Sequence, residues 1–191
     1  MKTSSTADIV KVLEKNNELL RIKYQVDPHL EMAEIQRRIY RDNGPAILFE
    51  NVKDCQFQCI SNIYGTTKRA KLLFKKTYKA VRSIISAKGD PVGLLKHPFG
   101  AMQALVTAGY GLPLKVPNSV APVMQCRAKL EDLPQIVSWP MDGGAYITLP
   151  QVYSEHPDHI GNPFKSNLGM YRIQMSGNEY IKNKEIGLHL S

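Results

Sequence analysis

A proline-rich segment at residues 111–122 divides the chain into two stretches with different hydrophobic patterns. The segment holds Pro113, Pro117 and Pro122. Proline lacks a backbone donor and interrupts regular structure, so we predict a connector here. The 191 residues are enough for one large domain or two small ones. We therefore place a domain boundary at this segment, with a first domain at 1–115 and a second unit at 116–191.

Two helices are predicted near the start of the chain. Residues 5–17 carry apolar residues on one face, and Ser5 is placed to cap the helix. A second helix is expected to open with Asp27 as the N-cap and Pro28 at the first helical position. Its apolar stripe consists of Met32, Ile35 and Ile39. The tripeptide Asn-Gly-Pro at 43–45 is expected to end it.

Three strands are predicted between and after these helices. Residues 20–26 alternate apolar and polar side chains, which is typical of a half-buried strand. Residues 46–52 form a nearly continuous apolar run, which favours a central strand covered on both faces. A third strand is expected at 57–63. A strand–helix–strand order predicts an α/β or α+β layer.

The second unit has the pattern of a β-sheet or barrel. Turn signals lie at Asp142-Gly143-Gly144 and Ser176-Gly177-Asn178. The expected strands occupy residues 121–127, 136–139, 146–153, 167–175 and 180–190.

The net charge of +8 is concentrated in one segment. Residues 68–96 hold nine lysines or arginines and one acid, Asp90, and residues 67–86 have helical apolar spacing. The basic face of this helix could simply be solvated, or it could contact an anionic membrane surface. No aromatic platform, helix-turn-helix or zinc pattern accompanies it, so no nucleic-acid partner is expected.

The remaining composition favours a cytoplasmic protein. No apolar run reaches the ~18 residues of a membrane span, and the first residues lack the apolar core of a signal peptide. The chain has three cysteines, too few and too irregular for a disulfide framework. Cys55 and Cys59 lie four apart on a predicted strand and are interpreted as small buried side chains. Residues 156–159 hold two histidines and an aspartate, fewer ligands than a zinc site needs.

The segments 139–150 and 167–174 carry the candidate chemistry. In the second, alternation puts Asn167 on one strand face and Met170 and Arg172 on the other. A neutral oxygen ligand and a fixed cation this close together would suit an anionic ligand held through a metal ion. Such residues also occur on strands in purely structural roles.

Five ordered motifs give the chain a specific resemblance to a known family. It resembles the UbiD family of decarboxylases, which use prenylated flavin mononucleotide (prenylated FMN). Residues 20–31 resemble the opening strand and helix of the family. The other four motifs are GPAILFENVK at 44–53, NIYGT at 62–66, WPMDGGAYITLP at 139–150 and NLGMYRIQ at 167–174. Members acting on quinone precursors, such as menaquinone-pathway decarboxylases, look nearest.

The resemblance implies an α+β fold with a particular order of domains. An N-terminal α/β domain at 1–115 is followed by the first strands of a split β-barrel, similar to flavin reductases, at 116–191. The barrel is expected to bind prenylated FMN, with its phosphate held through a divalent metal, typically manganese, and with potassium nearby.

The resemblance also assigns roles to individual residues. Asn167 and His189 match the metal-binding asparagine and histidine, and Arg172 matches the catalytic arginine. Thr148, Asn167, Met170 and Arg172 are expected to contact the cofactor. An arginine can orient the substrate carboxylate, while the cofactor carries the hard chemistry.

The family's metal-binding and catalytic glutamates find no match in this sequence. The chain is therefore expected to be part of a longer decarboxylase and inactive alone. The alternative is a non-catalytic subunit or binding module that completes its barrel with a partner chain. Other implied partners are an aromatic or unsaturated carboxylic acid, a flavin prenyltransferase that supplies the cofactor, and further copies in a homo-oligomer. Peripheral contact with the inner membrane is a further hypothesis.

Overall fold

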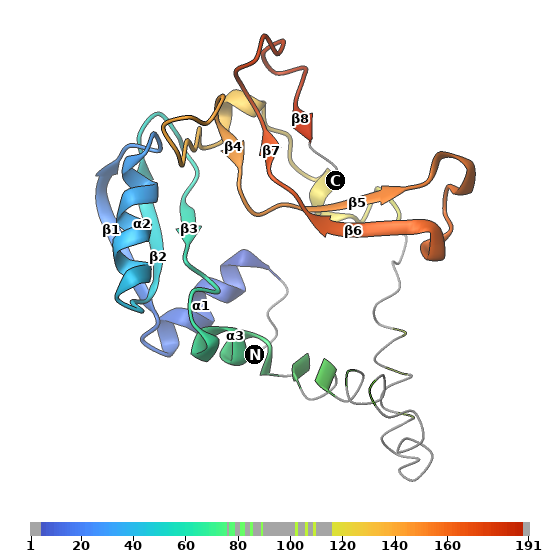
Figure 1. The fold of residues 1–191 in the computed structure, drawn as a ribbon, viewed down its shortest axis with the longest axis horizontal. Helices are drawn as coiled ribbons and strands as arrows, with labels where there is room; N and C mark the ends of the chain where they lie inside the picture. Colours follow the sequence, from blue (N-terminus) through green and yellow to red (C-terminus); the bar gives the residue numbers. More distant parts are fainter. Residues whose placement is uncertain are drawn as a thin grey trace.

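The fold was analysed in a computed structural model of the chain. It describes residues 5–75 and 116–188 and, between them, residues 77, 78, 81, 82, 85, 89, 102, 106 and 109. The N-terminal sheet with its helices lies at one end of the molecule, and the C-terminal strands lie beside it and extend away from it (Figure 1). Residues 92–110, for which the sequence predicts short helices, lie almost entirely outside the described residues.

The N-terminal unit is built around a three-stranded sheet. The strands are β1 (Leu19–Val26), β2 (Ala46–Val52) and β3 (Cys59–Ser61), in the order β1-β2-β3. β1 and β2 are parallel, because α2 (Glu31–Arg41) crosses between them, and β3 returns antiparallel. The prediction that residues 46–52 form the central strand is confirmed.

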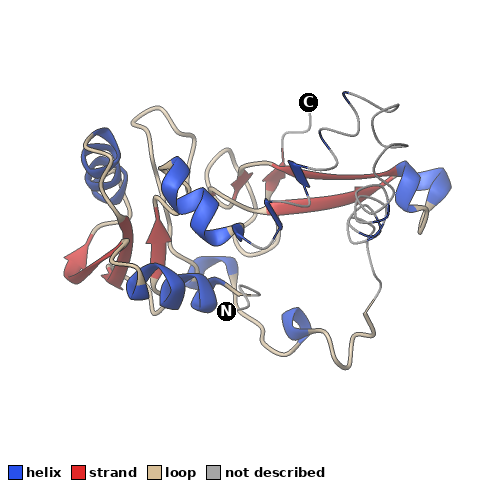
Figure 2. Cartoon of the chain, turned by 90° about the horizontal axis from the view of Figure 1, so that it is seen from below, coloured by secondary structure: helices blue, strands red, loops and turns tan. Residues whose placement is uncertain are grey.

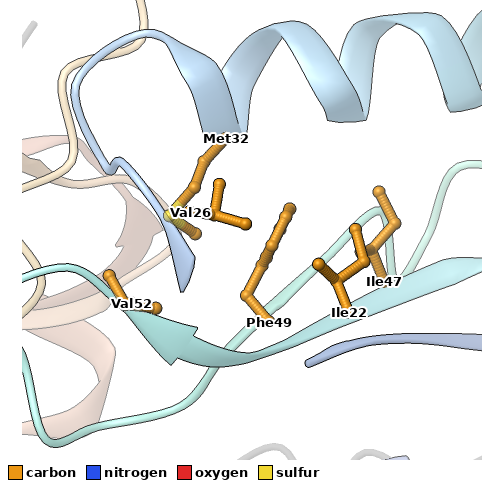
Figure 3. Close-up of a cluster of buried hydrophobic side chains, with 6 residues drawn as sticks. All are labelled: Ile22, Val26, Met32, Ile47, Phe49 and Val52. Atoms are coloured by element: carbon orange, nitrogen blue, oxygen red, sulfur yellow. The ribbon is translucent and has the colours of Figure 1, made fainter. Parts of the chain in front are cut away.

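Two apolar clusters cover β2. In the first, Met32 of α2 points toward Val26, and the same cluster includes Ile22, Ile47 and Phe49 of the sheet (Figure 3). Ile35 and Ile39 pack against the same cluster, which confirms the predicted stripe of α2. The second cluster joins Ala46 and Ile63 to residues of α1 (Thr6–Lys15) and α3 (Thr67–Leu73). Cover on both sides explains why the sequence of β2 is almost continuously apolar.

Several N-terminal boundaries differ from the predictions. α2 starts at Glu31 and not at Pro28, and its N-cap residue is Leu30, at a φ of 68° and without a capping side chain. The Asp27 carboxylate instead accepts a hydrogen bond from the backbone amide of His29. β3 covers only Cys59–Ser61 of the predicted 57–63, so Cys55 lies outside it.

The half-buried pattern of β1 is only partly confirmed. Ile22 and Val26 are buried, whereas Leu20 and Tyr24 are exposed. The pairing with β2 shifts register between Ile22 and Gln25. Because such an irregularity disturbs the two-residue alternation, Tyr24 does not continue the buried face.

The basic segment begins with a buried charge. Arg69 of α3 is 0% exposed, and its Nη1 donates to Glu18 at 3.2 Å and to the Gly44 carbonyl at 2.7 Å. Lys68 forms an ion pair with the other carboxylate oxygen of Glu18. The interpretation of this segment as a wholly solvated face is therefore wrong for Arg69. Much of the predicted helix beyond residue 75 lies outside the described residues.

The C-terminal half consists of short strands in two small sheets. β4 (Tyr146–Ile147), β7 (Ile173–Gln174) and β8 (Gly187–Leu188) form one sheet in the order β4-β7-β8. β5 (Gln151–Glu155) and β6 (Ser166–Met170) form a two-stranded antiparallel ribbon. The ribbon points away from the N-terminal sheet in Figures 1 and 2. The mixed α+β class is confirmed.

The predicted strands of this half are shorter or absent. Residues 121–127 form no strand but contain the 3₁₀ helix η1 (Pro122–Met124), because Pro122 supplies no donor to a ladder. In place of a strand at 136–139 there is one isolated bridge, at Val137. The segment 146–153 is divided into β4 and β5, and 167–175 into β6 and β7. Further 3₁₀ turns are η2 (Leu130–Asp132), η3 (Pro157–His159) and η4 (Pro163–Lys165).

Backbone hydrogen bonds connect the two halves. The Leu30 amide donates to the Val137 carbonyl at 2.9 Å, and the Val137 amide donates to the Pro28 carbonyl at 3.2 Å. The Cys55 thiol also lies 3.4 Å from the Asp132 carbonyl oxygen. The segment before α2 thus holds the start of the C-terminal half against the N-terminal sheet. Among the described residues, no helix combines the length and apolar character needed to cross a membrane.

Candidate functional site

The best-defined polar cluster of the C-terminal half surrounds Arg172. This residue lies between β6 and β7. Its Nη2 donates to the Asp142 carboxylate at 2.8 Å, and its guanidinium carbon lies 3.9 Å from the centre of the Tyr146 ring. A carboxylate at the edge and an aromatic ring at the face are both favourable partners for a guanidinium. The arginine is therefore held from two directions.

Asp142 closes a turn as well as pairing with Arg172. Its Oδ2 accepts hydrogen bonds from the amides of Ser138 at 3.2 Å and Trp139 at 3.1 Å. Burial would raise the pKa of this carboxyl, but the hydrogen bonds from Arg172 and the Trp139 amide outweigh burial, so the pKa lies below its ordinary value. Asp142 is therefore ionised at neutral pH.

The loop that carries Asp142 is packed closely against the turn after β7. The Ala145 amide donates to the Ser176 hydroxyl at 3.0 Å, and the Met175 amide donates to the Ala145 carbonyl at 2.8 Å. A Cβ atom on Gly144 would lie 2.0 Å from the Ser176 carbonyl oxygen. The two loops approach each other closely at Asp142-Gly143-Gly144, and there is no room for a side chain at position 144.

Asn167 and Met170 lie on opposite faces of the β5–β6 ribbon. Asn167 is paired with Ser154 and Met170 with Gln151, and successive residues of a strand alternate between faces. The Asn167 Nδ2 donates to the Tyr171 hydroxyl at 2.9 Å. Of the predicted cofactor contacts, these two side chains are therefore separated by the ribbon, although both are exposed.

Thr148 and Arg172 flank the last residue pair of the β4–β7 ladder. Ile147 pairs with Ile173 in the β4–β7 ladder, so Thr148 and Arg172 are the next residues in register beyond its end. Thr148 is exposed. The register thus places Thr148 and Arg172 at the same end of the β4–β7 ladder. His189, the predicted metal ligand, lies outside the described residues.

Two other candidate clusters lack the composition of a metal site. The rings of His156 and His159 are 5.2 Å apart in an exposed turn. Cys55 and Cys59 are free thiols in contact with the first apolar cluster, and burial raises the pKa of Cys59 to about 12. Within the described ranges, no group of three or more histidine, cysteine or acidic side chains is arranged to hold a metal ion.

A cleft of about 470 Å³ lies between the two halves of the chain. Asp27, His29 and Lys53 line it on the N-terminal side, and Asp142 and Ser176 line it on the other. Lys53 is paired with Asp27 at 2.8 Å. Thr148, Asn167, Met170 and Arg172, the described members of the predicted site, are not among its lining residues.

The two partners of Arg172 do not follow from sequence reasoning. The local pattern marks Asp142 only as a turn residue and Tyr146 only as a strand residue. The one available signal is that both belong to the same short motif at 139–150, which precedes the arginine motif. Nothing in the local pattern indicates a contact across 30 positions.

Two family models match consecutive parts of the chain. The N-terminal domain of 3-octaprenyl-4-hydroxybenzoate carboxy-lyase, UbiD_N, matches residues 10–88. The Rift-related domain of the same carboxy-lyase, UbiD, matches residues 115–191. The two matches are in the order expected for one family, and together they cover most of the chain.

Bacterial relatives match nearly the whole chain. An uncharacterised protein of Chlamydia caviae is 36% identical over an alignment of 199 positions, gaps included, that covers 99% of this chain and 31% of that protein. A Chlamydia pneumoniae protein named as a subunit of 4-hydroxybenzoate decarboxylase is 34% identical over 186 residues, covering 94% of this chain and 30% of that protein. The chain thus spans about a third of the length of these relatives.

Solved structures share the fold at lower identity. Vanillic acid decarboxylase of Sedimentibacter hydroxybenzoicus, in its closed form, has a TM-score of 0.70 and 22% identity over 95% of this chain and 36% of its own. The UbiD-class enzyme HmfF of Pelotomaculum thermopropionicum, in complex with FMN, has a TM-score of 0.68 and 21% identity over 97% of this chain and 36% of its own. Sequence and fold agree, and the chain belongs to the UbiD family of carboxy-lyases.

Proposed function

We propose that the chain forms the N-terminal part of a decarboxylase that depends on prenylated FMN. Residues 1–115 would be its α/β domain, and residues 116–191 would supply the first strands of a split barrel that binds the flavin. Family membership supports this assignment. So do the solved HmfF structures, one in complex with FMN and another with prFMN.

The observation that carries the proposal is the state of Arg172. Its side chain is 42% exposed, and only Nη2 forms a hydrogen bond to another described residue. The remaining N–H groups are free to bind an anion, and a guanidinium binds carboxylates or phosphates through paired hydrogen bonds. The residues present therefore fit an anionic cofactor or a substrate carboxylate at this place.

The other assigned residues would hold the cofactor around Arg172. Thr148, next to Arg172 in register, would contact the flavin with its hydroxyl. Asn167 would offer its carbonyl oxygen to a divalent metal such as manganese, with His189 as a second ligand and potassium nearby. Met170, on the opposite ribbon face from Asn167, would meet the cofactor through its main chain.

Arg172 would orient the substrate carboxylate for the loss of CO2. Because Asp142 and Tyr146 already hold the guanidinium, it would bind the substrate carboxylate in a defined orientation. Bound prenylated FMN would supply the electron sink for the carbon–carbon bond that breaks.

The substrate class that we propose is an aromatic or unsaturated carboxylic acid, with a quinone precursor as the specific case. The names of the family and of the Chlamydia pneumoniae relative, both hydroxybenzoate carboxy-lyases or decarboxylases, support the aromatic class. A flavin prenyltransferase would supply the cofactor, and the complete enzyme would be a homo-oligomer. By itself this chain would be inactive.

A non-catalytic subunit is the second candidate. The relative named as a subunit supports it. The β5–β6 ribbon also supports it, because the described residues pair no third strand with it. Such a subunit would complete its barrel with strands of a partner chain. Native mass spectrometry of the protein purified from its source distinguishes the two proposals. A non-catalytic subunit would appear in a stable heteromer, whereas the decarboxylase would contain only copies of one chain.

Flavin binding tests the principal proposal. FMN is titrated into the chain with and without Mn²⁺, and dissociation constants are compared for the native protein and Arg172→Gln. We expect Arg172→Gln to weaken binding about tenfold, because one charge-assisted hydrogen bond is worth about 1.5–3 kcal/mol. The matched control is Arg127→Gln, an exposed arginine elsewhere. Equal affinities for all three proteins would refute the assignment.

Contact with an anionic membrane surface is a further proposal for the basic segment. Phe74 and Tyr78 are exposed beside Lys71 and Lys75. Aromatic and basic residues on one exposed segment favour an interface between water and lipid. Co-sedimentation with vesicles of phosphatidylserine and phosphatidylcholine should exceed that with phosphatidylcholine alone, and equal amounts in both pellets would end the proposal.

A further inference from the structure

The Asp142–Arg172 contact joins two motifs that are far apart in the sequence. Asp142 precedes β4, and Arg172 follows β6. We propose that Asp142 is the positioning residue for Arg172, acting together with the ring of Tyr146. Any role of this contact in decarboxylation rests on the proposed function, whereas the positioning of Arg172 is a property of the folded chain.

The Asp142 carboxylate cannot move independently of its loop. The side chain is 9% exposed, and one oxygen accepts from Ser138, Trp139 and Arg172. Any displacement of this oxygen breaks the turn at 138–142 as well as the ion pair. The carboxylate is therefore a fixed anchor, while a partner on a long flexible side chain would not be.

Tyr146 fixes the second direction. Its hydroxyl donates to the Gln174 side-chain carbonyl at 3.1 Å, and the pairing of β4 with β7 holds the backbone that carries the ring. The guanidinium carbon is 3.9 Å from the ring centre, so the guanidinium lies over the aromatic face. With its face on Tyr146 and one nitrogen on Asp142, the guanidinium is held in one orientation by two different groups.

Substitutions at 142 and 146 can remove the charge or the aromatic ring next to Arg172 while the surrounding loop is kept. Asp142→Asn keeps an oxygen that accepts from the Ser138 and Trp139 amides, so the turn can persist, but the ionic attraction to Arg172 is lost. Tyr146→Phe keeps the ring and removes only the hydroxyl, whereas Tyr146→Leu removes the aromatic face. These substitutions test whether the carboxylate and the ring, and not the loop fold, hold the arginine.

The experiment is NMR of the Arg172 side-chain Nε–Hε group in the full chain, assigned by its loss in Arg172→Lys. In the native protein, the proton over the Tyr146 ring should be shifted upfield by the ring current. We expect this shift to be lost in Asp142→Asn and in Tyr146→Leu and to be kept in Tyr146→Phe. Backbone amide signals of Ser138 and Trp139 report whether the turn persists.

An unchanged Arg172 signal in Asp142→Asn, with the turn intact, would overturn the proposal. If that variant does not fold, Asp142→Ser carries the same test, because its hydroxyl can also accept from the turn amides. Titration of FMN separates this inference from the proposed function. An Arg172 signal that depends on Asp142 but does not respond to FMN supports positioning and removes the assigned binding role.

Discussion

The two halves of the chain differ in how completely they bury their own apolar side chains. In the N-terminal unit, two clusters cover the central strand β2. In the described part after residue 115, only Ala145 and Met175 among the apolar residues are buried. The difference teaches that strand pairing alone does not make a core. A two-stranded ribbon needs a packed face for independent stability, and β5–β6 has none within the described chain.

Truncation of one large apolar residue in each half should give the largest contrast. Phe49→Ala removes a ring that is 0% exposed and should lower the free energy of unfolding by about 3–5 kcal/mol. The matched change is Leu168→Ala, on a side chain that is 65% exposed, with an expected effect within about 0.5 kcal/mol. Urea unfolding followed by circular dichroism measures both. Similar losses for the two would break the comparison.

The buried ion pair between Arg69 and Glu18 should contribute strongly to the stability of the N-terminal unit. Arg69→Met keeps much of the side-chain volume but leaves Glu18 without its buried partner. We expect a loss of about 3 kcal/mol, the lower end for such pairs, because Lys68 still contacts Glu18. Lys68→Met, at an exposed site, should cost less than about 1 kcal/mol. Thermal unfolding of both variants at neutral pH checks this order, and a reversed order would contradict it.

The same pair gives stability a dependence on pH. A hydrogen bond from Lys68, together with that from Arg69, holds the pKa of Glu18 below its ordinary value of 4.5. The unfolded chain therefore binds the proton more readily, so this contribution is present above pH 4.5 and is lost as the pH falls below it. In Glu18→Gln, the free energy of unfolding should depend less on pH in the range below pH 4.5. A curve parallel to that of the native protein would show that other carboxylates dominate.

Gly144→Ala tests a tight loop contact of the C-terminal half. The added Cβ would lie 2.0 Å from the Ser176 carbonyl oxygen, a backbone atom that cannot easily move. We expect a loss of about 2 kcal/mol, in the range of overpacking. Gly89→Ala is the control, because no described residue lies within 4 Å of its Cβ position. Its effect should be neutral or stabilising by less than about 1 kcal/mol. Equal stabilities of the two variants in urea would show that this half rearranges freely.

The smallest expected effect is at the start of α1. The Ser5 hydroxyl accepts a hydrogen bond from the Asp8 amide at 3.2 Å. Ser5→Ala should lower stability by about 1 kcal/mol, and Ser5→Asp should preserve it, because aspartate is an equally good cap. Thermal unfolding of the two variants checks the cap. If alanine and aspartate behave alike, the first turn of α1 contributes nothing to the N-terminal unit.

Features set by neighbouring residues agree well with prediction. The cap at Ser5, the stripe of α2 and the central strand β2 each follow from spacing within one element. The predicted start of α2 is wrong because Asp27 binds the His29 amide in a local turn, while the Glu31 carboxylate accepts from the Asp27 amide. Asp27 can either cap a helix or form this turn, and the spacing of residues in the sequence does not decide between the two.

The candidate site is predictable as a set of residues but not as an arrangement. The motif at 167–174 points to Arg172 and Asn167, and the ribbon then separates Asn167 from Met170 by the pleat of β6. Asp142 and Tyr146 could not be selected, because their link to Arg172 depends on how β4 pairs with β7. Strand register is decided by packing and turns across the sheet, which the pattern of one strand does not contain.

The sequence by itself determined the cap of α1, the apolar stripe of α2, the central strand β2, the concentration of positive charge and the family. Tertiary structure alone decided that Arg69 is buried against Glu18 and that Arg172 rests between Asp142 and Tyr146. The physical reason is the range of the interactions. Caps and alternation act over a few residues, whereas an ion pair between distant segments forms only after the chain has folded around it.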